Sequence, residues 1–248
     1  MTGAGQEGLE NGLTPGRGET LDEIGPVRVL QRRDGYRLTV DPLLLARFTR
    51  SAAGPLKGRV IDLGTGCGIL PLLLAHAGVS SVGLELQPPL FDLAARNVRL
   101  NGLEARISVV RGDLREVERL FAKARFRHVV CNPPYHRARH GLTNPDLERA
   151  LARHELACTV RDVVRAARWL LEPLGSLWII FPAARLAELL EAVRRVRLSP
   201  RRLQLIHPRA DTPARRVLLQ AVKAGRATLE VLPPCVLESR LQPAVQAL

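Results

Sequence analysis

The chain has 248 residues, of which 46% are hydrophobic and 25% are charged. This length suits one domain with a small appendage, because single α/β domains often exceed about 200 residues. No apolar run approaches the roughly 20 residues that a membrane span requires, and the N-terminal residues show neither an export signal nor an Arg-rich transit pattern. We therefore expect a soluble protein of the cytoplasm.

Four cysteines are spread along the chain without the paired spacing of a zinc site or the density of a disulfide-rich secreted domain. They are Cys67, Cys131, Cys158 and Cys235. None of the six histidines has a partner at metal-ligand spacing. The sequence therefore predicts a reducing compartment and no bound metal.

The formal net charge is +13, with 34 arginines against 3 lysines. Residues 1–23 hold five acids and one arginine, which leaves +17 on residues 24–248. A body this basic attracts polyanions such as nucleic acids. A general preference for arginine explains the charge equally well, so charge alone leaves both interpretations open.

The first fifth of the chain predicts a tail, a hairpin and a helix. Residues 1–18 lack apolar periodicity, which indicates a flexible tail. Two alternating segments between Val27 and Thr39 flank Arg33-Asp34-Gly35, and Asp-Gly in such a place predicts a β-hairpin. A helix is expected over Pro42–Thr49, with Asp41 as its cap.

Strand and helix patterns then alternate, which is typical of a parallel sheet flanked by helices. The expected strands are 59–63, 81–86, 107–110, 128–131 and 176–181, and the expected helices are 69–76, 88–101, 115–123, 159–171 and 183–196. Two final extended runs, 202–207 and 216–223, are joined by too few residues for a parallel crossover, so they should pair antiparallel.

We therefore predict an α/β, Rossmann-like fold with a mostly parallel seven-stranded sheet, an antiparallel C-terminal strand and helices on both faces. The expected divisions are a flexible tail over 1–19, a hairpin and helix element over 20–55, the main domain over 56–234 and a tail over 235–248.

A glycine-rich loop, Gly64-Thr65-Gly66-Cys67-Gly68, follows the first buried strand and opens a helix. Glycine lets the backbone approach a ligand closely because it has no Cβ. A dinucleotide fingerprint would need glycine at Ile69, which disfavours NAD. Glu85 ends the second strand, where a carboxylate can accept hydrogen bonds from both ribose hydroxyls. Asp113 follows the third strand, where it can accept a hydrogen bond from an adenine amino group. Together these features predict a nucleoside site.

A second motif, Asn132-Pro133-Pro134-Tyr135, closes the fourth strand, so we expect it at the same sheet edge as the glycine loop. The Asn132 side-chain oxygen and the Pro133 carbonyl could accept both N–H bonds of a planar amine and aim its lone pair at a methyl donor. Tyr135 would stack on the planar group. The alternative reading of these residues alone is a tight turn without chemistry.

The two motifs resemble the signature of class I S-adenosylmethionine-dependent methyltransferases, in which D-x-G-x-G-x-G begins the fold. The resemblance implies that the loop glycines pack under the methionine part of S-adenosyl-L-methionine, that Asp62 helps hold its amino group, and that no metal is needed. The expected cofactor-binding residues are Asp41, Asp62, Gly64, Thr65, Gly66, Gly68, Glu85, Asp113, Leu114 and Asn132. The expected catalytic residues are Asn132, Pro133, Pro134 and Tyr135.

The N-P-P-Y form of the second motif is shared by adenine-N6, cytosine-N4 and glutamine-N5 methyltransferases, so the acceptor is expected to be a planar amino nitrogen. Over about residues 20–234 the chain is more closely similar to the bacterial tRNA1(Val) adenine-N6 methyltransferases. The match rests on Gly35–Ala46, Asn132–Tyr135, Ala152–Glu155, and His207–Ala210 running into Arg216–Leu218. The resemblance implies tRNA as the partner and an anticodon-loop adenine as the acceptor. We expect no membrane partner and a monomer.

Basic residues are more frequent here than we expect of that family. They are His136, Arg137, Arg139 and His140 after the motif, then Arg194, Arg195, Arg197, Arg201 and Arg202, and finally Arg209, Arg215 and Arg216. If they face the same sheet edge as Tyr135 they form an RNA track, and if not they are solvated charge.

Three alternatives stay open. A protein-glutamine N5-methyltransferase shares N-P-P-Y but normally carries an N-terminal helical recognition domain, and only 26 residues precede Val27. A DNA adenine methyltransferase would need a target-recognition domain, for which no stretch is long enough. A catalytically silent RNA-binding factor would not need Asp62, Glu85 and Asn132 intact.

Overall fold

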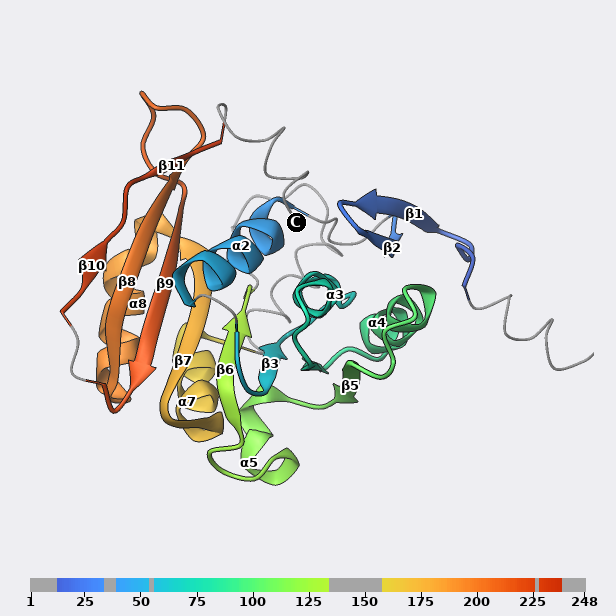
Figure 1. The fold of residues 1–248 in the computed structure, drawn as a ribbon, viewed down its shortest axis with the longest axis horizontal. Coiled ribbons are helices and arrows are strands. Elements are labelled where there is room, and N and C mark those ends of the chain that lie inside the picture. The colour runs from blue at the N-terminus through green and yellow to red at the C-terminus, as the bar shows by residue number, and fades with distance from the viewer. Residues whose placement is uncertain (1–12, 34–38, 54–55, 134–157, 226–227, 238–248) are drawn as a thin grey trace, which may run out of the picture. The chain divides into compact units, whose positions relative to one another are not determined.

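The computed structural model describes residues 13–33, 39–53, 56–133, 158–225 and 228–237 (Figure 1). The chain divides into two compact units, which we call the N-terminal unit (residues 1–112 with 239–248) and the C-terminal unit (residues 113–238). Each unit is described by itself.

The N-terminal unit begins with a β-hairpin of β1 (Glu19–Ile24) and β2 (Val27–Arg32), in which Ile24 lies opposite Val27. The turn is therefore Gly25-Pro26, with Gly25 at a φ of 56°. Glycine adopts this positive φ without strain, and proline supplies the negative φ that the next position of such a turn needs. The hairpin predicted around Arg33-Asp34-Gly35 stays a prediction, because residues 34–38 lie outside the described residues; the hairpin that the structure describes lies one strand earlier, with β1 as a partner of β2.

Helix α2 (Asp41–Ala53) follows and is longer than the predicted Pro42–Thr49. The Leu44 amide donates to the Val40 carbonyl (3.0 Å), so Asp41 lies within the first helical turn. Asp41 is almost fully buried, and its own amide donates to Thr39 Oγ1 (3.3 Å).

Three parallel strands form the sheet of this unit, in the order β3 (Val60–Leu63), β4 (Ser81–Glu85) and β5 (Ile107–Arg111). They are connected by α3 (Ile69–His76) and α4 (Pro88–Leu100). Every residue of β3 and β4 is buried, as expected of parallel strands covered on both faces. All five elements lie within one residue of their predicted bounds.

The C-terminal unit contains three helices in its described part: α5 (Val117–Leu120), α7 (Val160–Leu170) and α8 (Leu186–Arg195). Short 3-10 turns, η1 (Leu114–Glu116) and η2 (Ala183–Arg185), precede α5 and α8. The strands are β6 (Phe126–Cys131), β7 (Leu171–Pro182), β8 (Leu198–His207), β9 (Arg216–Lys223), β10 (Glu230–Val231) and β11 (Cys235–Val236).

The sheet of the C-terminal unit has the order β6-β7-β9-β8, and the two-residue strands β10 and β11 both pair with β8. Strands β6 and β7 are parallel, whereas β9 is antiparallel to both β7 and β8. The predicted antiparallel pairing of the last two long strands is therefore confirmed. It also follows that β6, β7 and β8 all point in one direction.

The helix predicted over 115–123 is wrong in its length, because α5 ends at Leu120. Phe121 adopts an extended backbone, its ring packs edge-on against Phe126 with centroids 5.6 Å apart, and its carbonyl accepts a hydrogen bond from Trp169 Nε1 (3.1 Å). These tertiary contacts outweigh the helical periodicity of the segment.

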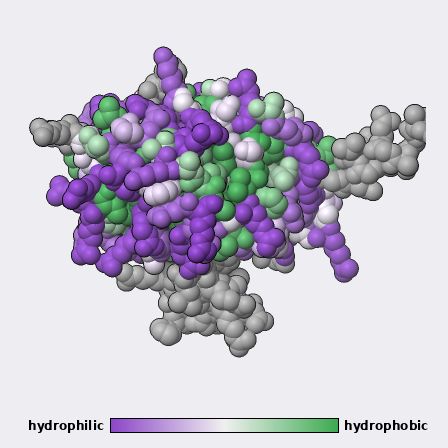
Figure 2. Space-filling view, turned by 90° about the horizontal axis from the view of Figure 1, so that it is seen from below, coloured by the Kyte–Doolittle hydropathy of each residue, from purple (hydrophilic) through white to green (hydrophobic). Residues whose placement is uncertain are grey.

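The fold is thus a mixed α/β, Rossmann-like fold whose sheet is mostly parallel with β9 antiparallel, as the sequence predicts. On the face shown in Figure 2, hydrophilic residues cover most of the described surface, interrupted by small hydrophobic areas. No helix among the described residues is long and apolar enough to cross a membrane.

Candidate active site

The glycine loop lies between the buried strand β3 and the buried helix α3. Gly64 and Gly66 have φ values of 73° and 59°, which residues with a side chain rarely adopt. Apart from its chain neighbours, a Cβ built on either glycine would meet no atom of the described residues within 4 Å. The loop therefore presents bare backbone to open space, which fits a ligand lying directly on it.

Glu85, the last residue of β4, is buried beside this loop and is held by the backbone. Its Oε2 accepts a hydrogen bond from the Gly66 amide (2.8 Å), and its Oε1 accepts one from the Gln87 amide (2.9 Å). Each carboxylate oxygen has a second lone pair, so the group can still accept two ligand hydroxyls in a fixed orientation.

Asp62 is a buried acid in β3, two residues before the first glycine of the loop. Burial raises the pKa of its carboxyl to about 7, and the neighbouring Glu85 carboxylate acts in the same direction. Burial also raises the pKa of the Cys67 thiol, to about 11, so this thiol stays protonated near neutral pH. A cation placed at Asp62 would favour the ionised carboxylate, which fits the amino group that the resemblance assigns to it.

Thr65, in the middle of the loop, packs against Gly83 of β4. A Cβ on Gly83 would lie 2.9 Å from the Thr65 side chain, so the strand has to carry glycine at this point for the loop to sit so close. Two cofactor candidates of this unit remain. Gly68 is the N-cap of α3 with a φ of 85°, and a Cβ there would lie 3.3 Å from the Ala94 Cβ. Asp41 lies in the first turn of α2, and both roles stay predictions.

Asn97 of α4 is a functional candidate that sequence reasoning missed. Its side chain is fully buried, donates to the carbonyls of Cys67 (2.9 Å) and Leu30 (3.0 Å), and accepts from the Leu30 amide (2.7 Å). It therefore ties the glycine loop to the hairpin strand β2. The signal was available, since Asn97 is a polar residue among the buried positions of a strongly amphipathic helix.

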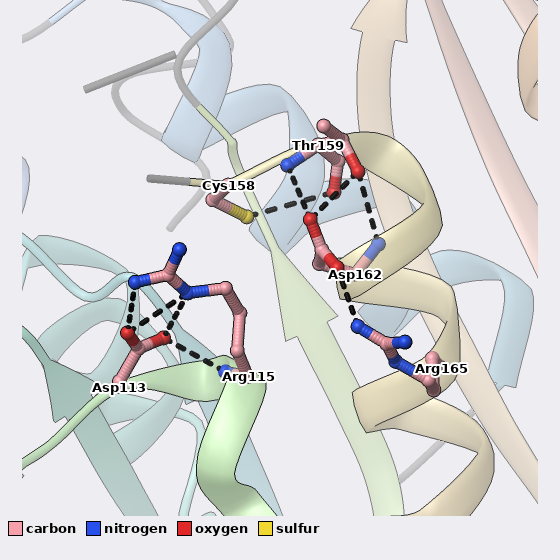
Figure 3. A network of polar contacts seen from close by, with 6 residues as sticks. All are labelled: Asp113, Arg115, Cys158, Thr159, Asp162 and Arg165. Atoms are coloured by element: carbon pink, nitrogen blue, oxygen red, sulfur yellow. Dashed lines mark hydrogen bonds and ion pairs between the residues drawn. The ribbon is translucent and has the colours of Figure 1, made fainter. Parts of the chain in front are cut away.

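Asp113 opens the C-terminal unit and caps η1 (Figure 3). It accepts a hydrogen bond from the Arg115 amide (2.8 Å), while Arg115 Nε and Nη2 reach both of its oxygens at 2.5–3.0 Å. Burial opposes ionisation of Asp113, yet the bonds and charge of Arg115 bring its pKa below the ordinary value. Asp113, which we predict to contact adenine, therefore already forms hydrogen bonds with the Arg115 side chain. Leu114, the other candidate here, lies between these two residues in the sequence.

The turn that begins α7 lies near this pair. Thr159 and Asp162 form a capping box, with the Thr159 amide donating to Asp162 Oδ2 (2.9 Å) and the Asp162 amide donating to Thr159 Oγ1 (3.3 Å). Burial and the carboxylates of Asp162 and Asp113 raise the pKa of the Cys158 thiol to about 12. Cys158 is therefore a neutral group beside Asp113 rather than a nucleophile.

Asn132 and Pro133 follow directly on β6, with Asn132 half-buried and Pro133 buried. They lie at the carboxyl edge of the C-terminal sheet, because they follow the last residue of β6. Pro134 and Tyr135 lie outside the described residues, as do the basic run 136–140 and the segment 152–155.

His128 of β6 accepts a hydrogen bond from Trp178 Nε1 at its Nδ1 (3.2 Å), which makes it a satisfied core histidine. The described residues contain no group of three or more metal-binding side chains.

The fold and these sites define a class of protein. A family model described as the methyltransferase small domain matches residues 41–196. The structure is similar to a crystal structure from Agrobacterium tumefaciens described as a predicted O-methyltransferase, with a TM-score of 0.66 and 24% identity over 84% of this chain and 95% of that one. The fold is that of class I methyltransferases.

Comparison with curated proteins narrows the class. The chain is 30% identical to a tRNA1(Val) (adenine(37)-N6)-methyltransferase of Porphyromonas gingivalis over 73% of this chain and 72% of the relative. It is 29% identical to the protein of that name from Photobacterium profundum over 75% of this chain and 77% of the relative. The chain belongs to the methyltransferase small domain family, within the group that holds these tRNA1(Val) methyltransferases.

Proposed function

We propose that this methyltransferase uses S-adenosyl-L-methionine to methylate the N6 amino group of an adenine in tRNA, an unpaired adenine of the anticodon loop; the names of its relatives give adenine 37 of tRNA1(Val). The observation that carries the proposal is the buried Glu85 carboxylate, fixed by the backbone beside a glycine loop that faces open space. A carboxylate held in this way is suited to the two hydroxyls of a ribose.

In this proposal four residues of the N-terminal unit contact different parts of the cofactor. Gly64 and Gly66 approach the methionine part, Asp62 holds its ammonium group and Glu85 accepts the ribose hydroxyls. Bound there, the cofactor supplies an electrophilic methyl group on a sulfonium sulfur. Asp113 and the Leu114 amide serve the adenine ring.

Asn132 and Pro133 prepare the acceptor. An exocyclic amine on an aromatic ring is a poor nucleophile because its lone pair is delocalised into the ring. The Asn132 side-chain oxygen and the Pro133 carbonyl accept its two N–H bonds, which localises the lone pair and aims it at the methyl group. Proline suits the second place because it has no amide hydrogen of its own there.

The choice of tRNA rests on the names of the relatives and on the basic body of the chain, +17 over residues 24–248. A base of an RNA loop can be splayed out and stacked on an aromatic side chain, which we assign to Tyr135, whereas a base in a stem must first unpair.

A parallel acceptor assay tests the proposal. Labelled S-adenosyl-L-methionine is offered with unmodified tRNA, duplex DNA or a release-factor protein, and the label is followed into each. We expect label in tRNA alone. Label in the protein with none in tRNA would replace the proposal by the glutamine-N5 activity, and label in DNA alone would replace it by a DNA adenine activity.

A further inference from the structure

Two pairs of exposed arginines in the C-terminal unit lie at opposite edges of its sheet. Because β8 points in the same direction as β6, the residues that follow β8 share the carboxyl edge with Asn132. Arg209 and Arg215, in the loop between β8 and β9, lie at that edge. Arg194 and Arg197 precede β8 and lie at the amino edge, roughly 30 Å away along a strand of this length.

The loop between β8 and β9 is built by its own hydrogen bonds. Thr212 Oγ1 accepts from the Arg209 amide (3.1 Å) and donates to the Arg209 carbonyl (2.9 Å). His207 Nδ1 lies 2.7 Å from the Thr212 carbonyl oxygen, which can only accept, so this ring nitrogen carries the hydrogen. The Arg215 amide donates to the Ile206 carbonyl (2.9 Å) and closes the loop.

This fixed backbone carries exposed cations. Arg209 has an ion pair with Asp211 at 3.3 Å, but both groups are exposed and such pairs are weak. Arg215 is exposed and makes no ion pair within the described residues. Arg185 stands at the same edge, at the end of β7, held by Glu188 (2.8 Å) and by the Phe181 ring at 4.9 Å.

We propose that the loop between β8 and β9 is a contact site for the phosphate backbone of the substrate RNA, through Arg209 and Arg215; this inference rests on the proposed function. A guanidinium binds a phosphate with two parallel hydrogen bonds, and a preformed loop loses little entropy when it does so. Three strand spacings separate β6 from β8, or roughly 14 Å. The loop therefore reaches a phosphate near the target nucleotide and not the target base itself.

The amino edge supplies a matched control. Arg194 and Arg197 are also exposed, and they line a hollow of about 670 Å³ with Leu190 and Leu198. The double variants R209Q/R215Q and R194Q/R197Q remove the same charge from the same unit. A general effect of charge would weaken RNA binding equally in both, whereas a local contact would not.

The experiment measures the affinity of both variants for unmodified tRNA over a range of salt concentrations. We expect R209Q/R215Q to bind roughly tenfold more weakly, with the slope of log K against log salt reduced by about 1 to 2, and R194Q/R197Q to change about threefold or less. The KM of R209Q/R215Q for tRNA should rise, while its kcat at saturating tRNA should stay unchanged. The charge-preserving variant R209K/R215K should recover part of the affinity.

Equal losses in the two variants, or a larger loss in R194Q/R197Q, would overturn the assignment of the loop. That result is distinguishable from a failure of the proposed function, because wild-type protein would still methylate tRNA. Wild-type protein that does not bind tRNA at all would refute both. Melting temperature and cofactor affinity, which the loop should not affect, show whether each variant is intact.

Discussion

Glu85 is the last residue of β4 and Asp113 follows β5, and both are assigned to the same nucleoside, but they are held differently. Glu85 is buried and accepts hydrogen bonds from two backbone amides. Asp113 is partly exposed: one oxygen accepts from a single backbone amide, and its other bonds come from the guanidinium of Arg115. A backbone partner cannot be exchanged for water without moving the chain, whereas a side chain can swing away. We therefore expect the ribose end of the site to be rigid and the adenine end to be adjustable.

Replacement of Glu85 should have the largest effect on cofactor binding. In E85Q one carboxylate oxygen becomes an NH2 group that faces a backbone amide, and a charged acceptor is lost. The expected cost is about 1.5–3 kcal/mol, or roughly ten- to a hundredfold in the calorimetric Kd for S-adenosyl-L-methionine. Since Glu85 also holds Gly66, melting curves should show a small loss of stability, which E85A should enlarge. A folded E85Q protein with unchanged affinity would remove Glu85 from the site.

A smaller effect should come from the charge of Asp62, whose raised pKa of about 7 has two consequences. The folded protein binds a proton that the unfolded chain has released, so this residue lowers the stability of the apoprotein as pH rises from about 4 to 7. If the ionised carboxylate holds the cofactor ammonium group, affinity should rise roughly five- to tenfold between pH 6 and 7.5. The Cys67 thiol does not titrate in this range. Calorimetry should show this rise in the wild type and a flat profile in D62N; a rise in D62N of the same size would assign it to another group.

The smallest effect should follow from R115A, which removes the guanidinium from both oxygens of Asp113 and leaves the backbone amide of residue 115 on Oδ1. The adenine amino group would no longer have to compete with the guanidinium, so affinity for the cofactor should rise by about two- to threefold, as the pair is solvent-exposed. D113A should instead lower the affinity by a similar factor. If R115A binds more weakly than the wild type, Arg115 orients Asp113 for the ligand and the adenine end is as fixed as the ribose end.

The parts of this fold that were predictable are those with a short-range signal. The strands and helices of the glycine-loop region carry apolar runs or, in α4, amphipathic periodicity, and their bounds agree with the structure to within one residue. The hairpin of β1 and β2 was not predicted, because no local signal marks residues 19–24 as its first strand; the pairing of β2 with β1 identifies it. Helix α5 ends early because Phe121 contacts Phe126 of β6 and Trp169 of α7. Both residues belong to other elements, so a local pattern does not show these contacts.

The candidate site shows the same limit. The loop glycines and Glu85 were found from their spacing, but Asn97 and Arg115 were not, since their roles depend on which backbone group or acid each one faces. The basic residues could be counted from sequence, yet only the strand directions divide them between two edges. Arg209 and Arg215 lie with Asn132, and Arg194 and Arg197 do not.

The central claim, that Asn132 directs methyl transfer to the N6 amino group of an adenine in tRNA, is tested most directly by mass spectrometry of nucleosides from unmodified tRNA. The tRNA is incubated with S-adenosyl-L-methionine and either the wild type or N132A. Asn132 acts chiefly during the reaction, so N132A should keep cofactor affinity and most tRNA affinity. We predict N6-methyladenosine with the wild type and essentially none with N132A. A different methylated nucleoside with the wild type, or N6-methyladenosine formed by N132A near the wild-type rate, would contradict the claim.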